Sequence, residues 1–387
     1  MPACFRAFTS KSWSSRLSSS SCLPTSAPDP RLEQLERWLE RVFGNRDFQI
    51  EPASADASFR RYFRVTRPGE SWIAMDAPPD KENMEPYVRV ASMLRDAGVN
   101  APRILEHDFA QGFLLNSDLG SQTYLAALEA GADAQRLYGD AIEALVRIQQ
   151  RADVHARTLP SYDEAMLRRE MALFPEWFCV CHLGIAPEHP QLAALAPVFD
   201  VLCASALEQP RVFVHRDYHS RNLMVCGGRT GANPGILDFQ DAVCGPLTYD
   251  LVSLLRDCYI AWPKEQLLDW MSRFRADAWG PGMSGVQSAE FRRWFDLMGV
   301  QRHLKAIGIF ARLWHRDGKP GYLKDIPRTL DYVRAVGREY RELQPLETFI
   351  DAHLIPALQK LAPAQVSESG SLSHQAVRGA GPMRGSP

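Results

Sequence analysis

The chain has 387 residues, of which 45% are hydrophobic and 23% are charged, and its formal net charge is −2. Its length predicts two or three domains or lobes, and its apolar content is sufficient for a sizeable core. The near-neutral charge argues against the basic surface of a nucleic-acid-binding protein, so we expect no nucleic-acid partner. Because no run approaches the ~20 apolar residues of a membrane-spanning helix, we expect no membrane association.

The two ends of the chain differ in composition from the middle. Residues 1–28 are rich in Ser and contain no acidic residue, which is typical of a transit peptide, a disordered leader or a wrongly assigned start codon. We therefore exclude residues 1–29 from the fold, together with residues 363–387, a Ser- and Gly-rich tail that we expect to be disordered. Eight scattered cysteines without zinc-site spacing predict reduced thiols and a cytoplasmic location.

The first folded part, residues 30–118, is predicted to form a small α+β lobe. Apolar residues at helical spacing, β-rich runs and turn residues define its elements. In chain order these are a helix over 31–43, strands at 62–65 and 72–75, a helix over 86–97, an extended segment over 99–107 and a strand at 112–115.

The second part, residues 119–362, is predicted to be larger and mainly helical. Its elements in chain order are helices near 124–130, 134–151 and 163–174, a strand at 212–214, a hairpin of 222–226 with 235–239, and helices from 249 to about 361. The boundary between the two parts is expected near residues 116–120, where the pattern changes from strand to helix.

The most informative stretch is HRDYHSRN, residues 215–222, which fits the pattern H-R-D-x-x-x-x-N of kinase catalytic loops. We expect Asp217 to act as the general base or to orient the attacking hydroxyl. Asn222 offers a neutral oxygen ligand to Mg²⁺, and Asp238, in Ile-Leu-Asp-Phe-Gln, offers a charged one after the predicted hairpin. The sequence thus predicts phosphoryl transfer from ATP.

The neighbours of these three residues have more than one interpretation. We expect His215 to hold the loop in place through hydrogen bonds rather than to react. His219 and Arg221 lie inside the loop, in reach of an acceptor or a phosphate. Asp250, in Gly-Pro-Leu-Thr-Tyr-Asp-Leu, either caps a helix or braces the catalytic loop by accepting its backbone N–H groups.

Taken together, HRDYHSRN, ILDFQ and GPLTYDL resemble the aminoglycoside phosphotransferase superfamily of small-molecule kinases. The resemblance implies an α+β, bilobal protein-kinase-like fold, with a small sheet-containing N-lobe and a larger, mainly helical C-lobe. It also implies ATP and Mg²⁺, and an adenine site near the inter-lobe segment, at Asn116, Asp118 and Leu119.

Three further strings narrow the resemblance: DASFRRYFRV at 56–65, MDAPP at 75–79 and FPEWF at 174–178. They resemble the anomeric kinases of Gram-negative cell-wall recycling, which phosphorylate N-acetylmuramate and N-acetylglucosamine at the C1 hydroxyl. This implies a small amino sugar as the acceptor, and the sequence indicates no protein partner. Kinases of the same fold that act on an aminoglycoside, choline or homoserine remain alternatives.

The chain departs from protein kinases in the N-lobe. No glycine lies between Gly44 and Gly69, and Met75 stands where the ATP-anchoring lysine of a kinase would be. We expect Ser58 to help cover the phosphates and Arg60 or Arg61 to supply the cation, with Lys81 as a further possibility. A nucleotide-binding pseudokinase is the alternative that the missing lysine leaves open.

Residues that recognise the acceptor are the hardest to predict. A sugar site commonly combines an aromatic face with a few hydrogen-bonding groups. Side chains of these types that lie at plausible positions are Glu170, Trp177, His182, Gln240 and Asp241.

Overall fold

A computed structural model of the chain describes residues 29–55, 59–152, 159–278 and 286–361. The predicted leader and tail therefore lie almost entirely outside the described residues. The chain divides into two compact units, residues 1–47 and 48–387. The first contains helix α1 (Pro30–Phe43), which begins where the Asp29 carboxylate accepts the N–H groups of Arg31 and Leu32, both at 3.1 Å.

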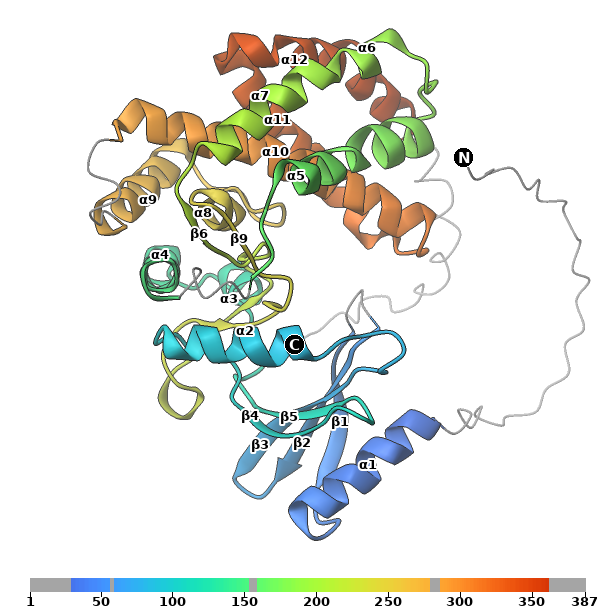
Figure 1. The fold of residues 1–387 in the computed structure, drawn as a ribbon, viewed down its shortest axis with the longest axis vertical. Helices are drawn as coiled ribbons and strands as arrows, with labels where there is room; N and C mark the ends of the chain where they lie inside the picture. The colour runs from blue at the N-terminus through green and yellow to red at the C-terminus, as the bar shows by residue number, and fades with distance from the viewer. Residues whose placement is uncertain (1–28, 56–58, 153–158, 279–285, 362–387) are drawn as a thin grey trace, which may run out of the picture. The chain divides into compact units, whose positions relative to one another are not determined.

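The second unit begins with a five-stranded antiparallel sheet (Figure 1). In spatial order its strands are β1 (Gln49–Ala55), β2 (Arg61–Arg67), β3 (Glu70–Asp76), β5 (Phe113–Ser117) and β4 (Ile104–Asp108). The predicted hairpin corresponds to β2 and β3, which turn at Gly69 with φ 79°. The sequence pattern does not predict β1, because Pro52 interrupts it.

Strand register determines which side chains share a face of this sheet. Tyr62 pairs with Met75 and Met75 with Leu114, so these three side chains lie on one face, and they belong to the main hydrophobic core. Helix α2 (Glu85–Asp96) lies between the sheet and the helical elements (Figure 1). Its Tyr87 ring packs 4.8 Å from the ring of Phe239, which follows Asp238. Met75 is therefore a core residue at the position where a kinase has its lysine.

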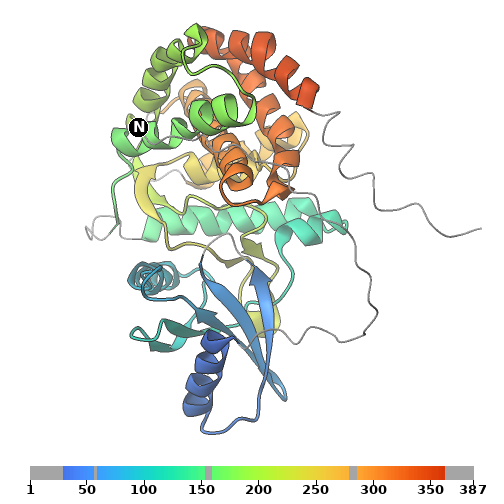
Figure 2. The same ribbon diagram turned by 90° about the vertical axis from the view of Figure 1, so that its right-hand side faces the viewer.

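The rest of the unit is mainly helical, which confirms the predicted fold class (Figure 2). The long helix α10 packs against α5, α7, α8, α11 and η1. The helices are α3 (Tyr124–Glu129), α4 (Ala134–Arg151), α5 (Glu164–Met171), η1 (Phe174–His182), α6 (Pro190–Ala193), α7 (Leu195–Leu207), η2 (Gly228–Thr230), α8 (Tyr249–Leu255), α9 (Lys264–Asp277), α10 (Ser288–His315), η4 (Pro320–Asp325), α11 (Ile326–Glu339), η5 (Arg341–Leu343), α12 (Gln344–Phe349) and η6 (Ile350–Leu354). The expected division into residues 30–118 and 119–362 stays a prediction.

Four short strands flank the predicted catalytic segment. β6 (Arg211–Val214) pairs with β9 (Val243–Pro246), and β7 (Leu223–Met224) pairs with β8 (Gly235–Ile236). The HRDYHSRN loop connects β6 to β7, and Asp238 follows β8. The predicted strand before the loop and the hairpin after it are both present, whereas β9 is an element that the sequence does not predict.

One stretch within the described ranges, Pro190–Leu207, is long and apolar enough to cross a membrane by length and composition alone. It comprises two helices, α6 and α7, and α7 packs against α5, α10 and α12. Core helices of soluble proteins pass the same test, so the stretch is weak evidence for a membrane span.

Candidate active site

The start of the catalytic loop is held by the buried carboxylate of Asp250, on α8. One oxygen accepts the N–H of His215 at 2.6 Å and the other accepts the N–H of Arg216 at 3.0 Å. Arg216 has a φ of 79°, a conformation that non-glycine residues rarely adopt without support. Thr248, at the N-cap position, makes no capping bond through its side chain. The contacts of Asp250 are therefore those expected of a loop brace rather than a helix cap.

A second buried carboxylate, Asp257, holds the other end of the loop. It accepts hydrogen bonds from both the N–H, at 3.0 Å, and the hydroxyl of Ser220, and from the N–H of Tyr259 at 3.0 Å. Sequence reasoning missed this residue. Its only signal is a position seven residues after Asp250, just beyond the end of α8.

The three residues predicted for chemistry converge in the structure. Nδ2 of Asn222 lies 3.3 Å from a carboxylate oxygen of Asp238 and 3.0 Å from the backbone oxygen of Asp217. Both contacts use Nδ2, so they leave the amide oxygen of Asn222 available to a cation. Asp238 has a φ of 63°, so it too has a backbone conformation typical of functional sites. One amide oxygen and one carboxylate suit a hard cation such as Mg²⁺.

The charge state of the loop follows from burial and neighbouring charges. Burial raises the pKa of Asp217, but the positive charges of Lys305 and Arg302 outweigh it, so the pKa lies below its ordinary value. Burial raises the pKa of Asp250 to about 7 despite its two backbone hydrogen bonds. Burial also lowers the pKa of His215 to about 4, so this imidazole is neutral near pH 7 and accepts the N–H of Asp217 at 3.3 Å.

The structure distinguishes between the two arginines expected to replace the kinase lysine. The guanidinium of Arg60 lies 4.0 Å from a carboxylate oxygen of Asp238, and its side chain is only 10% exposed. Arg61 instead forms two hydrogen bonds, of 3.0 and 2.6 Å, with the buried carboxylate of Asp76. Lys81 is exposed and pairs with Asp80. Only Arg60 of these cations is placed beside the predicted metal ligands.

The residues expected near adenine have different environments. Asn116 is 1% exposed, and neither polar atom of its side chain has a hydrogen-bond partner among the described residues. Asp118 is ion-paired with Arg64 at 2.7 Å and accepts the N–H of Gly120, so its carboxylate is already engaged and we do not retain it as a nucleotide contact. Leu119 is buried, and Ser58 lies outside the described residues.

A cavity of about 260 Å³ adjoins the catalytic loop. All three residues predicted for chemistry line it, as do His219 and Arg221. Its lining residues are Asp217, His219, Arg221, Asn222, Asp238, Tyr249, Cys258, Tyr259, Arg302, Lys305, Ala306, Ile309, Phe310, Leu313 and Tyr322. The aromatic rings and the cations from α10 are features of the cavity that sequence reasoning missed.

None of the five residues expected at the acceptor site by residue type lines this cavity. His182, on η1, instead contacts His315, with 3.1 Å between their ring nitrogens. Three others are also engaged elsewhere. Trp177 is on η1 and packs against the hydrophobic core. Gln240 donates to Asp238 at 3.0 Å, and the Asp241 backbone oxygen accepts a hydrogen bond from Arg216. Because Gln240 and Asp241 support the catalytic segment instead, we do not retain these three as sugar contacts.

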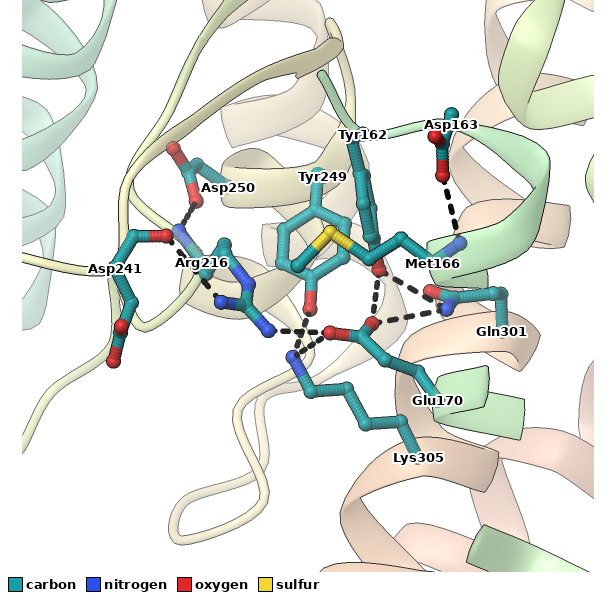
Figure 3. A network of polar contacts seen from close by, with 10 residues as sticks. All are labelled: Tyr162, Asp163, Met166, Glu170, Arg216, Asp241, Tyr249, Asp250, Gln301 and Lys305. Carbon is teal, nitrogen blue, oxygen red and sulfur yellow. Dashed lines mark hydrogen bonds and ion pairs between the residues drawn. The ribbon is translucent and has the colours of Figure 1, made fainter. Parts of the chain in front are cut away.

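Glu170, another residue expected at the acceptor site, belongs to a buried polar cluster beneath the loop (Figure 3). Its carboxylate forms ion pairs with Arg216 and, at 3.0 Å, with Lys305, and it accepts a hydrogen bond from Tyr162. Lys305 also donates to the hydroxyl of Tyr249 at 3.0 Å. The cluster links α5 and α10 to the catalytic loop, and its opposite charges make the burial of each ion tolerable.

Residues 49–285 match the family model described as "Phosphotransferase enzyme family". A Pseudomonas aeruginosa protein named N-acetylmuramate/N-acetylglucosamine kinase is 48% identical over 329 residues, which cover 82% of this chain and 95% of that protein. A Neisseria meningitidis protein of the same name is 46% identical over 318 residues, 81% of this chain and 93% of its own length.

Solved structures resemble the chain in fold. A choline kinase from Streptococcus pneumoniae has a TM-score of 0.57 at 10% sequence identity, and the match covers 79% of this chain and 100% of that one. The GDP complex of aminoglycoside 2′-phosphotransferase-IIIa has a TM-score of 0.53 at 14% identity, covering 80% and 98%. At these identities the likeness concerns the fold alone.

Proposed function

The chain belongs to the phosphotransferase enzyme family, and we propose that it is an ATP-dependent kinase for the anomeric C1 hydroxyl of N-acetylmuramate, N-acetylglucosamine or both. The observation that carries the proposal is the convergence of Asp217, Asn222 and Asp238 on one cavity. The names of relatives that are 46–48% identical support the choice of sugar.

Asp217 is the residue that orients the attacking hydroxyl. Its depressed pKa keeps the carboxylate ionised near neutral pH, as an acceptor for the hydroxyl hydrogen requires. Two buried carboxylates, Asp250 and Asp257, fix the backbone on either side of it. The loop is therefore held in place before substrates bind, which favours a single in-line transfer.

Asn222 and Asp238 are the residues that would hold Mg²⁺, since they bring an amide oxygen and a carboxylate together on the catalytic side of the cavity. The ion would neutralise charge that develops on the transferred phosphoryl group. Arg60, beside Asp238, adds a fixed positive charge on the sheet side and takes the place of the missing lysine. Asn116, whose buried amide has no hydrogen-bond partner within the described part of the chain, offers that amide to the nucleotide base.

The proposed setting is peptidoglycan recycling in the cytoplasm, with a free amino sugar as the acceptor and a sugar 1-phosphate as the product. An aminoglycoside acceptor fits less well. It carries several positive charges, which Arg221, Arg302 and Lys305 in the cavity lining would repel.

Replacing the proposed base tests the function directly. We expect Asp217→Asn to lower kcat on N-acetylmuramate by about 10²- to 10⁴-fold, because the amide cannot accept the proton. Asp200→Asn, at an exposed surface ion pair with Arg168, serves as the matched control. An ADP-release assay over amino sugars, aminoglycosides, choline and homoserine separates this proposal from kinases with other acceptors. Near-wild-type turnover of Asp217→Asn would refute the assigned role. If none of the acceptors in the panel supports ATP consumption by the unaltered enzyme, a pseudokinase would be favoured.

A further inference from the structure

The cavity beside Asp217 is lined by three cations, Arg221, Arg302 and Lys305, which differ in how they are paired. Of its three cations, Lys305 is paired with Glu170 at 3.0 Å. Arg302 lies one turn earlier on α10 and is 5% exposed. Within the ranges that the structure covers, the Arg302 guanidinium forms no ion pair, its Nε has no hydrogen-bond partner, and its Nη1 donates only to the Cys258 sulfur at 3.7 Å. Arg302 is thus a buried cation that interacts with Asp217 and Asp257 at longer range but has no carboxylate within ion-pair distance among the described residues.

Arg221, from the catalytic loop, is a second, partly buried cation of the cavity. Its guanidinium stacks 3.8 Å from the centre of the Tyr259 ring and 5.5 Å from that of Tyr322. These contacts fix its orientation, and no described carboxylate forms an ion pair with it. Because neither Arg302 nor Arg221 has a carboxylate within ion-pair distance among the described residues, both guanidinium groups can form charge-assisted hydrogen bonds with an anionic ligand in this cavity.

Two parts of the proposed substrates could supply the anion: the ATP phosphates and an acceptor carboxylate. Arg302 lies on α10, as does the cavity-lining Phe310, and Arg221 stacks on Tyr259 and Tyr322. Aromatic rings of this kind suit the apolar face of a sugar. The cation placed beside the predicted metal ligands is instead Arg60, from the sheet side. This arrangement favours the acceptor as the source.

We propose that Arg302 and Arg221 form a carboxylate subsite that selects N-acetylmuramate over N-acetylglucosamine by binding its lactyl group. The two sugars differ only by the lactyl ether on O3, and a guanidinium can bind the carboxylate of this group through charge-assisted hydrogen bonds. The inference rests on the proposed function and adds to it an order of preference between the two acceptors.

The test compares kcat/KM for both sugars in the full-length enzyme, its Arg302→Gln variant and Arg293→Gln as control. Arg293 lies on the same helix, is partly exposed and pairs with Glu342. We expect Arg302→Gln to lower kcat/KM for N-acetylmuramate by about 10- to 100-fold more than for N-acetylglucosamine, with KM for ATP unchanged. Loss of the Arg302 charge near Asp217 should affect both sugars equally. Arg293→Gln should leave both values within about 2-fold.

Equal losses on both sugars, or a raised KM for ATP, would overturn the subsite and leave the proposed function intact. Failure of the unaltered enzyme to phosphorylate either sugar would overturn the proposed function and this inference together. If Arg302→Gln does not fold, the methyl amide of N-acetylmuramate decides the question with the unaltered enzyme. We expect this neutral sugar to react within about 3-fold of N-acetylglucosamine. A methyl amide that reacts as well as the acid would contradict the subsite.

Discussion

The carboxylate of Asp250 accepts the backbone N–H of Arg216 at 3.0 Å, and Arg216 has a φ of 79°. The same carboxylate accepts the N–H of His215 at 2.6 Å, so it uses both oxygens on the residues just before Asp217. An unusual backbone conformation next to a catalytic residue persists only where surrounding contacts hold it. Asp250 thus ties the geometry of the reacting loop to the buried helix α8.

Asp250→Asn should lower kcat with little change in KM for either substrate. The amide keeps one acceptor oxygen but presents an N–H₂ to the second backbone N–H, so one hydrogen bond is lost and Asp217 is less well positioned. We expect a fall in kcat of about 10- to 100-fold. Steady-state kinetics with the folded variant checks this, and unchanged kcat would show that the loop does not depend on the brace.

The pKa of about 7 for Asp250 predicts a pH dependence. Protonation removes one of the two acceptors, so kcat should fall as the pH drops through 7, and Asp250→Asn should lack this limb. Stability changes in the opposite direction. Because burial raises the folded-state pKa above the unfolded value of 3.8, the group stabilises the fold at low pH and loses this contribution as the pH rises from about 4 to 7. Equal pH–rate profiles for the two proteins would contradict the assignment.

Arg60 and Arg61 should give different phenotypes although they are adjacent. We expect Arg60→Gln to raise KM for ATP about 10-fold, because a charge beside the phosphates is lost. Arg61→Gln should leave this KM within about 2-fold but destabilise the fold by about 1–2 kcal/mol, since the buried Asp76 loses an ion pair to a partly exposed partner. ATP titrations and urea unfolding separate the two effects. The reverse assignment of phenotypes would refute the role given to Arg60.

Asn116 should affect nucleotide binding rather than folding. Its buried amide has no partner among the described residues, so Asn116→Leu removes an unsatisfied group and should leave the unliganded protein as stable or slightly more stable. If the amide binds the adenine, the Kd for ADP should rise about 10-fold. Calorimetry measures both quantities on the same sample. Loss of stability with unchanged ADP affinity would instead identify Asn116 as a structural residue.

Glu170→Gln should destabilise the fold far more than Glu164→Gln, a substitution on the same helix. The change leaves the buried charges of Arg216 and Lys305 without their shared partner, which costs about 3–5 kcal/mol. Glu164→Gln, which breaks an exposed pair with Arg168, should cost at most about 1 kcal/mol. Urea unfolding of both variants provides the comparison. Similar losses in the two would show that the cluster in Figure 3 does not support the fold.

Local sequence signals predicted the framework of the site. The loop 215–222, the hairpin after it and the position of Asp238 all follow from short-range patterns, and the structure brings Asp217, Asn222 and Asp238 to one cavity. The fold class also followed from these motifs, through their resemblance to a known superfamily.

The remaining features depend on contacts between residues far apart in the chain. The sequence pattern does not say which of the adjacent residues Arg60 and Arg61 faces Asp238; in the structure Arg60 precedes β2, which begins at Arg61. The pairing of Glu170 with Lys305 joins residues on two different helices, α5 and α10, which no local pattern predicts. Trp177 was a reasonable sugar platform by residue type, and only tertiary packing places it against the core.

The position of the phosphate on the product tests the central claim most directly. After incubation of the full-length enzyme with ATP, Mg²⁺ and N-acetylmuramate, phosphorus-31 NMR should show coupling of the new phosphate to the anomeric proton. The sugar should also lose its reducing end, and the phosphate should be acid-labile. A phosphate coupled to the C6 protons of a sugar that keeps its reducing end would contradict the account.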